Sequence, residues 1–202
     1  MTRRDIPNLI TLLRILLVPP FLFALWKGDY WVALALFLVA GASDGLDGFL
    51  AKRYDWGTRF GSILDPIADK LLLVGAFLAL TWMGRIPLWL AIVVLGRDVL
   101  IVLGAVAYHF WIGRYRLDPA GLSKINTLIQ IVLVLVVIIT AATGKTPVGE
   151  QLTTWLIYIT MVTTVISGVH YTFVWGRRAL MIKRSPLSKQ HRQSPPPSGE
   201  GL

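Results

Sequence analysis

Six apolar runs, each of roughly 20 residues, follow one another along the chain and constrain its fold more than any other feature. A helix of about 20 residues crosses the ~30 Å hydrocarbon core of a bilayer. With 55% hydrophobic and only 15% charged residues among 202, the chain has too few polar side chains to cover a soluble domain. We therefore predict an all-α integral membrane protein with six transmembrane helices. The expected spans are Ile6–Trp26, Trp31–Leu50, Gly61–Met83, Pro87–Trp111, Gly121–Ala142 and Leu152–Val174.

Lysine and arginine are distributed unevenly between the two sides that six spans define. Fourteen of them fall in the N-terminal segment, the second and fourth loops and the C-terminal segment, whereas only Lys27, Arg85 and Lys145 fall on the opposite side. Positive residues concentrate in cytoplasmic segments of membrane proteins. We therefore expect both termini in the cytoplasm and a bacterial cytoplasmic membrane as the location. The net charge of +9 then faces anionic headgroups or an anionic substrate, and does not indicate nucleic acid.

Other parts of the chain suggest little beyond this domain. We expect no cleavable signal peptide, because the first apolar run continues directly into the fold. The lack of cysteine excludes disulfides and thiolate metal sites. Residues 183–202 are rich in Pro, Ser, Lys and Arg, which predicts a disordered cytoplasmic tail. The expected organisation is one transmembrane domain over residues 1–182, followed by this tail.

Four aspartates lie at the ends of two neighbouring apolar runs. Asp44 and Asp47 follow the apolar part of the second span, and Asp65 and Asp69 precede that of the third. The predicted topology brings both pairs to the cytoplasmic side at the same depth. Spacings of three and four residues put each pair on one helical face. Because carboxylates near hydrocarbon are costly, these four indicate a functional site.

Divalent cations would allow such carboxylates to stay ionised close to one another. Oxygen ligands of this kind suit Mg²⁺ or Mn²⁺. Gly48 and Gly61 add to the pattern, since glycine costs about 1 kcal/mol in a helix and indicates close approach of a backbone or ligand. The competing interpretation is structural: helices that pack through small residues, with aspartates paired to Lys52, Arg53 and Lys70.

Residues 44–69 read DGLDGFLAK, then eight residues, then GSILDPIAD. This segment resembles the signature of the CDP-alcohol phosphotransferase family, D-x-x-D-G-x-x-A-R, eight residues and G-x-x-x-D-x-x-x-D. The single departure is Lys52, followed by Arg53, where the family has arginine; lysine keeps the charge and loses the bidentate fork. Likeness covers roughly residues 5–180 and is strongest to the branch of phosphatidylglycerophosphate synthases and CMP-forming cardiolipin synthases.

The resemblance implies that the diphosphate of CDP-diacylglycerol is cleaved and its phosphatidyl group is passed to an alcohol, with release of CMP. It implies that Asp44, Asp47 and Asp65 bind two Mg²⁺ or Mn²⁺ ions, and that Asp69 is both a ligand and the general base. It further implies an active site facing the cytoplasm and, by family analogy alone, a homodimer. The residues implied in binding the CDP donor are Gly48, Ala51, Lys52, Arg53 and Gly61.

The candidates for binding an anionic glycerol-type acceptor are Arg97, Arg116, Lys124 and Asn126. Arg97 lies inside a span, where it either pairs with Asp98 or another carboxylate, or binds the acceptor. Lys124 is either an acceptor ligand or a snorkelling anchor. Phosphatidylglycerophosphate synthases of this kind have K-x-K-T where the chain has K-I-N-T. The uncharged Asn126 suits the single charge of phosphatidylglycerol, so we favour a cardiolipin synthase, with glycerol 3-phosphate as the alternative acceptor.

Asn8, Thr11 and Arg14 share a face of the first helix, and they either approach the same cavity or bond to neighbouring helices. Two other functions place aspartates in a membrane. An intramembrane prenyltransferase binds diphosphate through magnesium at two separated motifs, and a divalent-cation transporter has acidic residues near the bilayer midplane. One block of aspartates at the ends of two spans favours the phosphotransferase over both.

Overall fold

The computed structural model describes the backbone of residues 6–54, 61–112, 121–144 and 146–183, and the side chains of residues 10–43, 68, 70–104, 121, 123–144 and 146–173. The regular structure in these segments is entirely α-helical. The helices are α1 (Ile6–Lys27), α2 (Tyr30–Tyr54), α3 (Gly61–Trp82), α4 (Leu88–Ile112), α5 (Gly121–Ala142) and α6 (Pro147–Lys183).

The helices agree closely with the predicted spans, except at the ends of α2 and α6. Helix α6 begins at Pro147 rather than Leu152, because Thr146 caps it: the Gly149 N–H donates to Thr146 Oγ1 at 3.2 Å, and proline favours a first helical turn. Helix α6 continues to Lys183, and α2 continues to Tyr54. The hydropathy pattern detects only the apolar part of a helix, so these polar ends were missed.

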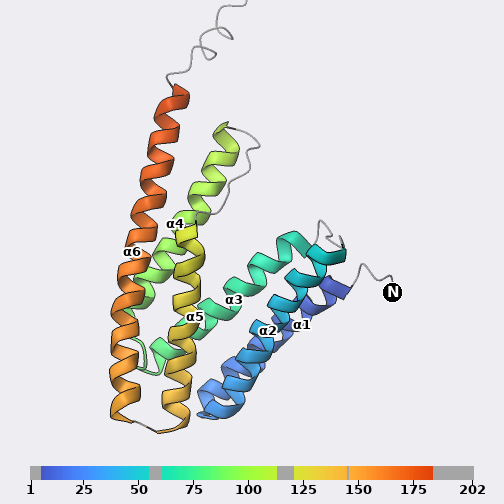
Figure 1. Ribbon diagram of the computed structural model, residues 1–202, viewed down its shortest axis with the longest axis vertical. Coiled ribbons are helices and arrows are strands. Elements are labelled where there is room, and N and C mark those ends of the chain that lie inside the picture. Colours follow the sequence, from blue (N-terminus) through green and yellow to red (C-terminus); the bar gives the residue numbers. More distant parts are fainter. Residues whose placement is uncertain (1–5, 55–60, 113–120, 145, 184–202) are drawn as a thin grey trace, which may run out of the picture.

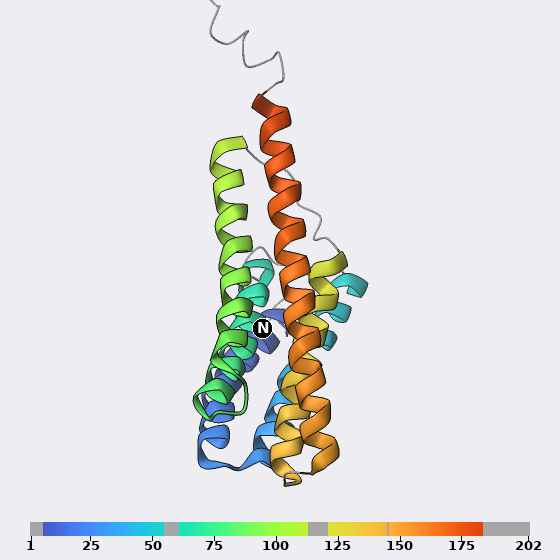
Figure 2. The same ribbon diagram turned by 90° about the vertical axis from the view of Figure 1, so that its left-hand side faces the viewer.

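Successive helices run in opposite directions, which gives the bundle two ends (Figure 1). At the turn end, short turns join α1 to α2, α3 to α4 and α5 to α6. At the aspartate end lie the last turns of α2 and the first turns of α3, which carry the four aspartates. Helices α1 to α3 lie together on one side and α4 to α6 on the other; α5 also contacts α2, and the two groups diverge toward the aspartate end (Figures 1 and 2).

The turns owe their tightness to glycines that end α1, α3 and α5. Gly28, Gly84 and Gly144 have φ angles of 82°, 69° and 81°, a region that glycine adopts at low cost. After Gly84, the Arg85 N–H donates to the Leu80 carbonyl at 2.8 Å, the bond that closes a Schellman motif. This bond fixes the direction in which the chain leaves α3.

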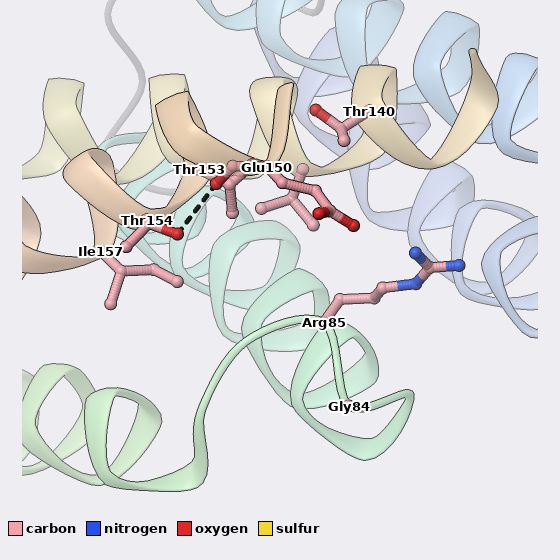
Figure 3. Close-up of a pocket in the computed structure, with 8 residues that line it drawn as sticks. Gly84, Arg85, Thr140, Glu150, Thr153, Thr154 and Ile157 are labelled. Carbon is pink, nitrogen blue, oxygen red and sulfur yellow. Dashed lines mark hydrogen bonds between the residues drawn. The ribbon is translucent and has the colours of Figure 1, made fainter. Parts of the chain in front are cut away.

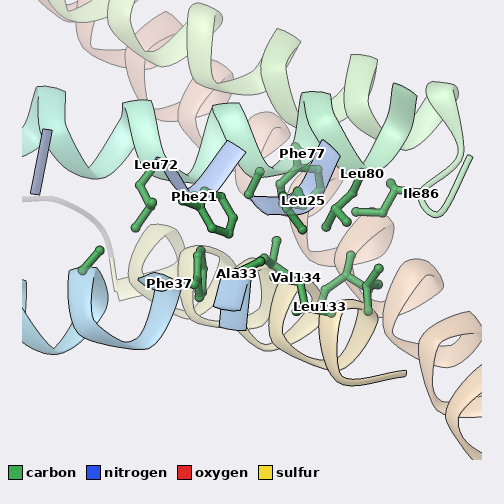
Figure 4. Packing of buried hydrophobic residues seen from close by; sticks show 14 of the residues in the cluster. Phe21, Leu25, Ala33, Phe37, Leu72, Phe77, Leu80, Ile86, Leu133 and Val134 are labelled. Atoms are coloured by element: carbon green, nitrogen blue, oxygen red, sulfur yellow. The ribbon is translucent and has the colours of Figure 1, made fainter. Parts of the chain in front are cut away.

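An apolar layer joins α1, α2, α3 and α5 near the turn end (Figure 4). We define it by five of its buried members, which are Phe21, Phe37, Phe77, Leu133 and Val134. The rings of Phe21 and Phe37 lie 5.5 Å apart between α1 and α2. Figure 4 shows Phe77 and Leu80 of α3 on one side of this layer and Leu133 and Val134 of α5 on the other.

The surface of the bundle is apolar while several polar groups lie inside. Leu103, Val162 and Val169 are 62%, 54% and 64% exposed, whereas Arg14, Asn126 and Thr164 are buried. This arrangement is typical of proteins whose solvent is lipid. The described residues contain three helices long and apolar enough to cross a membrane, over Ile10–Lys27, Ser123–Ala142 and Pro147–Phe173. The count of six spans and the cytoplasmic location of both termini stay predictions.

Candidate active site

The four aspartates lie on two helices at the aspartate end. Asp44 and Asp47 are one turn apart on α2, and Asp65 and Asp69 are one turn apart on α3. Their side chains are outside those that the structure describes. The same holds for the predicted donor-binding positions Gly48, Ala51, Lys52, Arg53 and Gly61, which share these helices. Arg116 lies between α4 and α5, outside the described residues.

The residue types at the aspartate end fit a divalent metal. Two helices contribute four carboxylates at one end of the bundle, and hard oxygen ligands of this kind are those that Mg²⁺ and Mn²⁺ prefer. Among the residues whose side chains are described, no three of His, Asp or Glu gather at one point. The four aspartates stay the predicted metal ligands.

Arg97 is the centre of a buried polar cluster between α4, α5 and α6. Its Nη1 donates to Asp98 Oδ1 at 2.8 Å, and its Nη2 donates to the hydroxyls of Ser123 and Ser167, each at 2.7 Å. The ring of Tyr171 lies 5.9 Å from the guanidinium carbon. The pairing of Arg97 with Asp98 is thus observed, and its binding of an acceptor stays a prediction.

A second ion pair ties this cluster to α3. The Asp98 carboxylate also pairs with Lys70 Nζ, and Lys70 directly follows Asp69 in the sequence. The side chain of Asp98 is 11% exposed and that of Lys70 is 45% exposed. The buried Arg97–Asp98 pair is the stronger of the two, and the half-exposed Lys70 adds a weaker contact. This weaker contact links α4 to the part of α3 next to the predicted general base.

Lys124 lies beside this cluster at the start of α5. It is exposed and lines an open groove of about 350 Å³ together with Ser123, Thr127, Leu128 and Ile131. Because Ser123 accepts a hydrogen bond from Arg97, the guanidinium of Arg97, which comes from α4, lies beside the turn of α5 that carries Lys124. The unsatisfied N–H groups of that first turn add partial positive charge. Lys124 and the start of α5 therefore add positive potential next to Arg97, whose own charge is paired with Asp98.

Asn126 is fully buried between α5 and α6. Its Oδ1 accepts from the hydroxyls of Thr163 and Thr164, both at 2.9 Å, and its Nδ2 has no hydrogen-bond partner in the described part of the chain. The amide group therefore helps to join two helices and keeps a free donor. Its predicted role toward the acceptor depends on that donor.

Several members of the site were not foreseen from the sequence. Ser123 and Ser167 are small polar residues in apolar helices, where nothing marks them as partners of an arginine. The sequence likewise does not mark Tyr171, whose ring lies beside Arg97. On α1, Thr11 and Arg14 are fully buried, so this face of the helix lies inside the protein. The side chain of Asn8 lies outside those described.

Comparison with known proteins identifies the family. The model of the family described as CDP-alcohol phosphatidyltransferase matches residues 4–166, which include the four aspartates, Arg97, Lys124 and Asn126. The chain belongs to this family. The segment that carries the predicted donor and acceptor residues is therefore shared with its members, and the apolar helices and the family together indicate a membrane protein.

Individual relatives carry two different names. A cardiolipin synthase (CMP-forming) from Rattus norvegicus is 32% identical over 198 residues, covering 88% of this chain and 63% of the rat protein. A probable phosphatidylglycerophosphate synthase from Mycobacterium tuberculosis is 33% identical over 174 residues, covering 83% and 79%. A CDP-diacylglycerol–glycerol-3-phosphate 3-phosphatidyltransferase from Pseudomonas fluorescens is 42% identical over 124 residues, covering 58% and 61%. The chain thus spans less than two thirds of the rat relative.

Proposed function

We propose that this protein transfers the phosphatidyl group of CDP-diacylglycerol to phosphatidylglycerol, releasing CMP and forming cardiolipin. The observation that carries the reaction class is the four-aspartate motif on α2 and α3, in a chain that belongs to the CDP-alcohol phosphatidyltransferase family. Phosphatidylglycerol is favoured by Asn126, an uncharged residue two positions after Lys124 on α5.

In the proposed reaction, a hydroxyl oxygen of the acceptor forms a bond to the phosphorus that carries diacylglycerol. The bond from that phosphorus to the bridging oxygen of CMP breaks, and CMP leaves with the electron pair. Asp69 takes the proton of the attacking hydroxyl. Asp44, Asp47, Asp65 and Asp69 would hold two Mg²⁺ or Mn²⁺ ions, which supply Lewis-acid stabilisation of the charge on the diphosphate. Gly48, Ala51, Lys52, Arg53 and Gly61 are the proposed contacts of the donor.

The acceptor phosphate is proposed to bind beside the first turn of α5. Arg97 Nη2 is held by two serine hydroxyls, which a phosphate oxygen can replace as hydrogen-bond acceptors. Lys124 lies in the open groove next to Ser123 and adds a second charge, and Arg116 precedes α5 in the chain. Asn126 Nδ2 would donate one neutral hydrogen bond, which suits a phosphodiester with a single negative charge.

Glycerol 3-phosphate is the second candidate acceptor. It is favoured by the 42% identity to the relative named CDP-diacylglycerol–glycerol-3-phosphate 3-phosphatidyltransferase and by the two cations, Arg97 and Lys124, at the start of α5. The location proposed for either reaction is a bacterial cytoplasmic membrane, with the aspartate end facing the cytoplasm. A homodimer is proposed on the family resemblance alone.

The test is an acceptor assay with the purified full chain, CDP-diacylglycerol and Mg²⁺ or Mn²⁺. Phosphatidylglycerol and glycerol 3-phosphate are supplied separately, CMP release is measured, and the lipid products are identified by mass spectrometry. We expect cardiolipin as the main product. Phosphatidylglycerophosphate without cardiolipin would establish the second candidate, and a protein that releases no CMP with either acceptor would contradict both.

A further inference from the structure

A polar cavity lies at the turn end of the bundle, away from the aspartates. It has a volume of about 310 Å³ and is bordered by the α3–α4 turn, the last turns of α5 and the first turns of α6 (Figure 3). Its polar lining consists of Arg85, Thr140, Glu150, Thr153 and Thr154. This volume is at the lower end of the range found for sites of small molecules and headgroups.

Groups of opposite charge face this cavity from its two sides. Figure 3 shows the Arg85 side chain extending from the α3–α4 turn beneath α5, and the Glu150 side chain extending from α6 into the space between α6 and that turn. Arg85 is held in place by Tyr30: its Nη2 donates to Tyr30 Oη at 3.3 Å, and its guanidinium carbon lies 5.6 Å from the ring centroid. A guanidinium fixed in this way loses little freedom when it binds a phosphate.

A buried hydroxyl also borders the cavity without a hydrogen bond. Thr153 Oγ1 is buried and has no hydrogen-bond partner in the described part of the chain, whereas Thr154 Oγ1 donates to the Glu150 carbonyl at 2.8 Å. A buried polar atom left unpaired costs free energy, so a native site of this kind indicates an absent partner. Thr153 is therefore available to a ligand that enters the cavity.

Three exposed tryptophans lie on the helices whose ends border the cavity. Trp82 precedes the α3–α4 turn and is 90% exposed, Trp89 follows it and is 42% exposed, and Trp155 adjoins Thr154 on α6 and is 62% exposed. Tryptophan is enriched at the interface between hydrocarbon and water, where lipid headgroups lie. This distribution favours a lipid headgroup as the occupant of the cavity.

From these observations we propose that the cavity binds the headgroup of a zwitterionic phospholipid that carries a primary ammonium group. The phosphodiester oxygens accept hydrogen bonds from the Arg85 guanidinium and from Thr153 Oγ1. The ammonium group donates to the Glu150 carboxylate, which has acceptor positions for several donors at once. Val137 and Ile157 contact the apolar part of the headgroup and the glycerol backbone.

The charge pattern selects this class of lipid. An anionic phospholipid satisfies Arg85 and brings no positive charge to Glu150. A quaternary ammonium headgroup keeps its positive charge but has no N–H to donate. The site is separate from the aspartate end, so this proposal stands whether or not the proposed reaction is correct.

The test is lipid binding to the purified full chain in detergent, followed by native mass spectrometry. The probes are the dihexanoyl forms of phosphatidylethanolamine, phosphatidylcholine and phosphatidylglycerol, together with O-phosphoethanolamine, which has the headgroup without the lipid. We expect phosphatidylethanolamine to bind at least tenfold more tightly than the other three probes. O-phosphoethanolamine binding as tightly as the lipid would contradict a lipid site, and equal binding of the three lipids would contradict the charge selection.

Single substitutions test the proposed contacts of Arg85 and Glu150 with the headgroup. Arg85→Gln should weaken binding of phosphatidylethanolamine and of phosphatidylglycerol about tenfold, as expected for loss of a charge-assisted hydrogen bond. Glu150→Gln should weaken phosphatidylethanolamine alone. Lys27→Gln removes a cation at the same end that lies over the Phe23 ring, outside the cavity, and should change neither. Equal binding by wild type and both cavity variants would overturn the proposal.

A variant that keeps the Arg85 guanidinium is the control for misfolding of the α3–α4 turn. Tyr30→Phe removes the hydrogen bond to Arg85 and leaves both charges in the cavity. It should bind phosphatidylethanolamine within a few-fold of wild type. If Arg85→Gln does not fold, Glu150→Gln against Lys27→Gln still decides the question, since selective loss of phosphatidylethanolamine supports the site and unchanged binding contradicts it.

Discussion

The apolar layer near the turn end and the polar cluster around Arg97 are both buried, yet their chemistry is opposite. The apolar layer contains phenylalanine, leucine and valine side chains from four helices. The polar cluster contains an arginine, an aspartate and serines from α4, α5 and α6, with Lys70 attached from α3. Since lipid tails are as apolar as leucine, the apolar layer stabilises the fold mainly through close packing.

The polar cluster cannot be explained in the same way. Charged groups inside a membrane protein are costly and require partners for each hydrogen-bonding atom. The cluster supplies partners for Nη1 and Nη2 of Arg97 from three helices, while Nε has none among the described residues. Lys70, which pairs with Asp98, directly follows Asp69. We infer that the apolar layer contributes to stability alone, that the aspartate end determines activity, and that the polar cluster contributes to both. Variants can separate these two contributions.

Chelation of divalent metal should have the largest effect. Excess chelator should abolish CMP release, because four neighbouring carboxylates need cations to bind a diphosphate, and Mg²⁺ or Mn²⁺ should restore it. The thermal unfolding temperature should change far less than the activity, since the apolar layer holds no metal ligand. Full turnover in excess chelator would contradict the role assigned to the aspartates.

Asp69→Asn should reduce turnover by about 10²- to 10⁴-fold, the range typical of a lost general base. The amide matches the carboxylate in shape, so the unfolding temperature should stay close to that of wild type. Asp29→Asn is the matched control, because Asp29 lies in the α1–α2 turn at the opposite end. Near-normal turnover by purified Asp69→Asn would show that another group accepts the proton.

Phe77→Ala should lower stability and leave turnover nearly unchanged, which is the reverse of the effect expected for Asp69→Asn. Phe77 is 1% exposed in the apolar layer, and its truncation should lower the free energy of unfolding by about 3–5 kcal/mol. Turnover per folded molecule should remain close to wild type. Leu78→Ala is the control on the same helix, since Leu78 is 51% exposed and should cost little. Stability is measured by denaturation in mixed micelles, and activity by CMP release from the folded fraction.

The sequence predicts the apolar helices and the aspartate motif. It does not predict the long-range contacts of the polar cluster, for physical reasons. Apolar runs predict helices well because lipid allows few other backbone structures. The Arg97–Asp98 pair is also predictable, because the two residues are adjacent in the chain. Ser167 lies 70 residues from Arg97, and its contact depends on how α4 packs against α6. That packing leaves no local signal in either helix.

The contacts of Asn126 show the same limit of prediction from sequence. Its uncharged side chain was recognised as a difference from the K-x-K-T pattern. Its burial against Thr163 and Thr164 depends on the register between α5 and α6, which follows from the short turn that joins them. The residues of a local motif were therefore easier to predict than contacts between residues far apart in the sequence.

Asp98→Asn should weaken both stability and activity, because it removes the carboxylate shared by Lys70 and Arg97. We expect a loss of about 3 kcal/mol in the free energy of unfolding, at the lower end for a broken buried ion pair because Lys70 is partly exposed. Lys70→Gln keeps the Arg97–Asp98 pair and should cost under about 1 kcal/mol. Equal losses for the two variants would show that the Arg97–Asp98 contact contributes little.

Asn126→Ala should produce the smallest and most specific effect. It removes the Nδ2 donor proposed for the acceptor, so the KM for phosphatidylglycerol should rise about tenfold while kcat changes little. It also removes the Oδ1 acceptor of Thr163 and Thr164, but Thr163 keeps backbone acceptors at Ile159 and Thr160, so the cost in stability should be about 1 kcal/mol.

Thr164→Val separates these two consequences of losing the amide. It deletes one hydrogen bond of Asn126 between α5 and α6 and leaves the Nδ2 donor in place. If the amide acts on the acceptor, Thr164→Val lowers stability by a similar amount and leaves the KM for phosphatidylglycerol unchanged. If both variants raise the KM equally, Asn126 acts only by joining the two helices, and the preference between acceptors must come from Arg97 and Lys124.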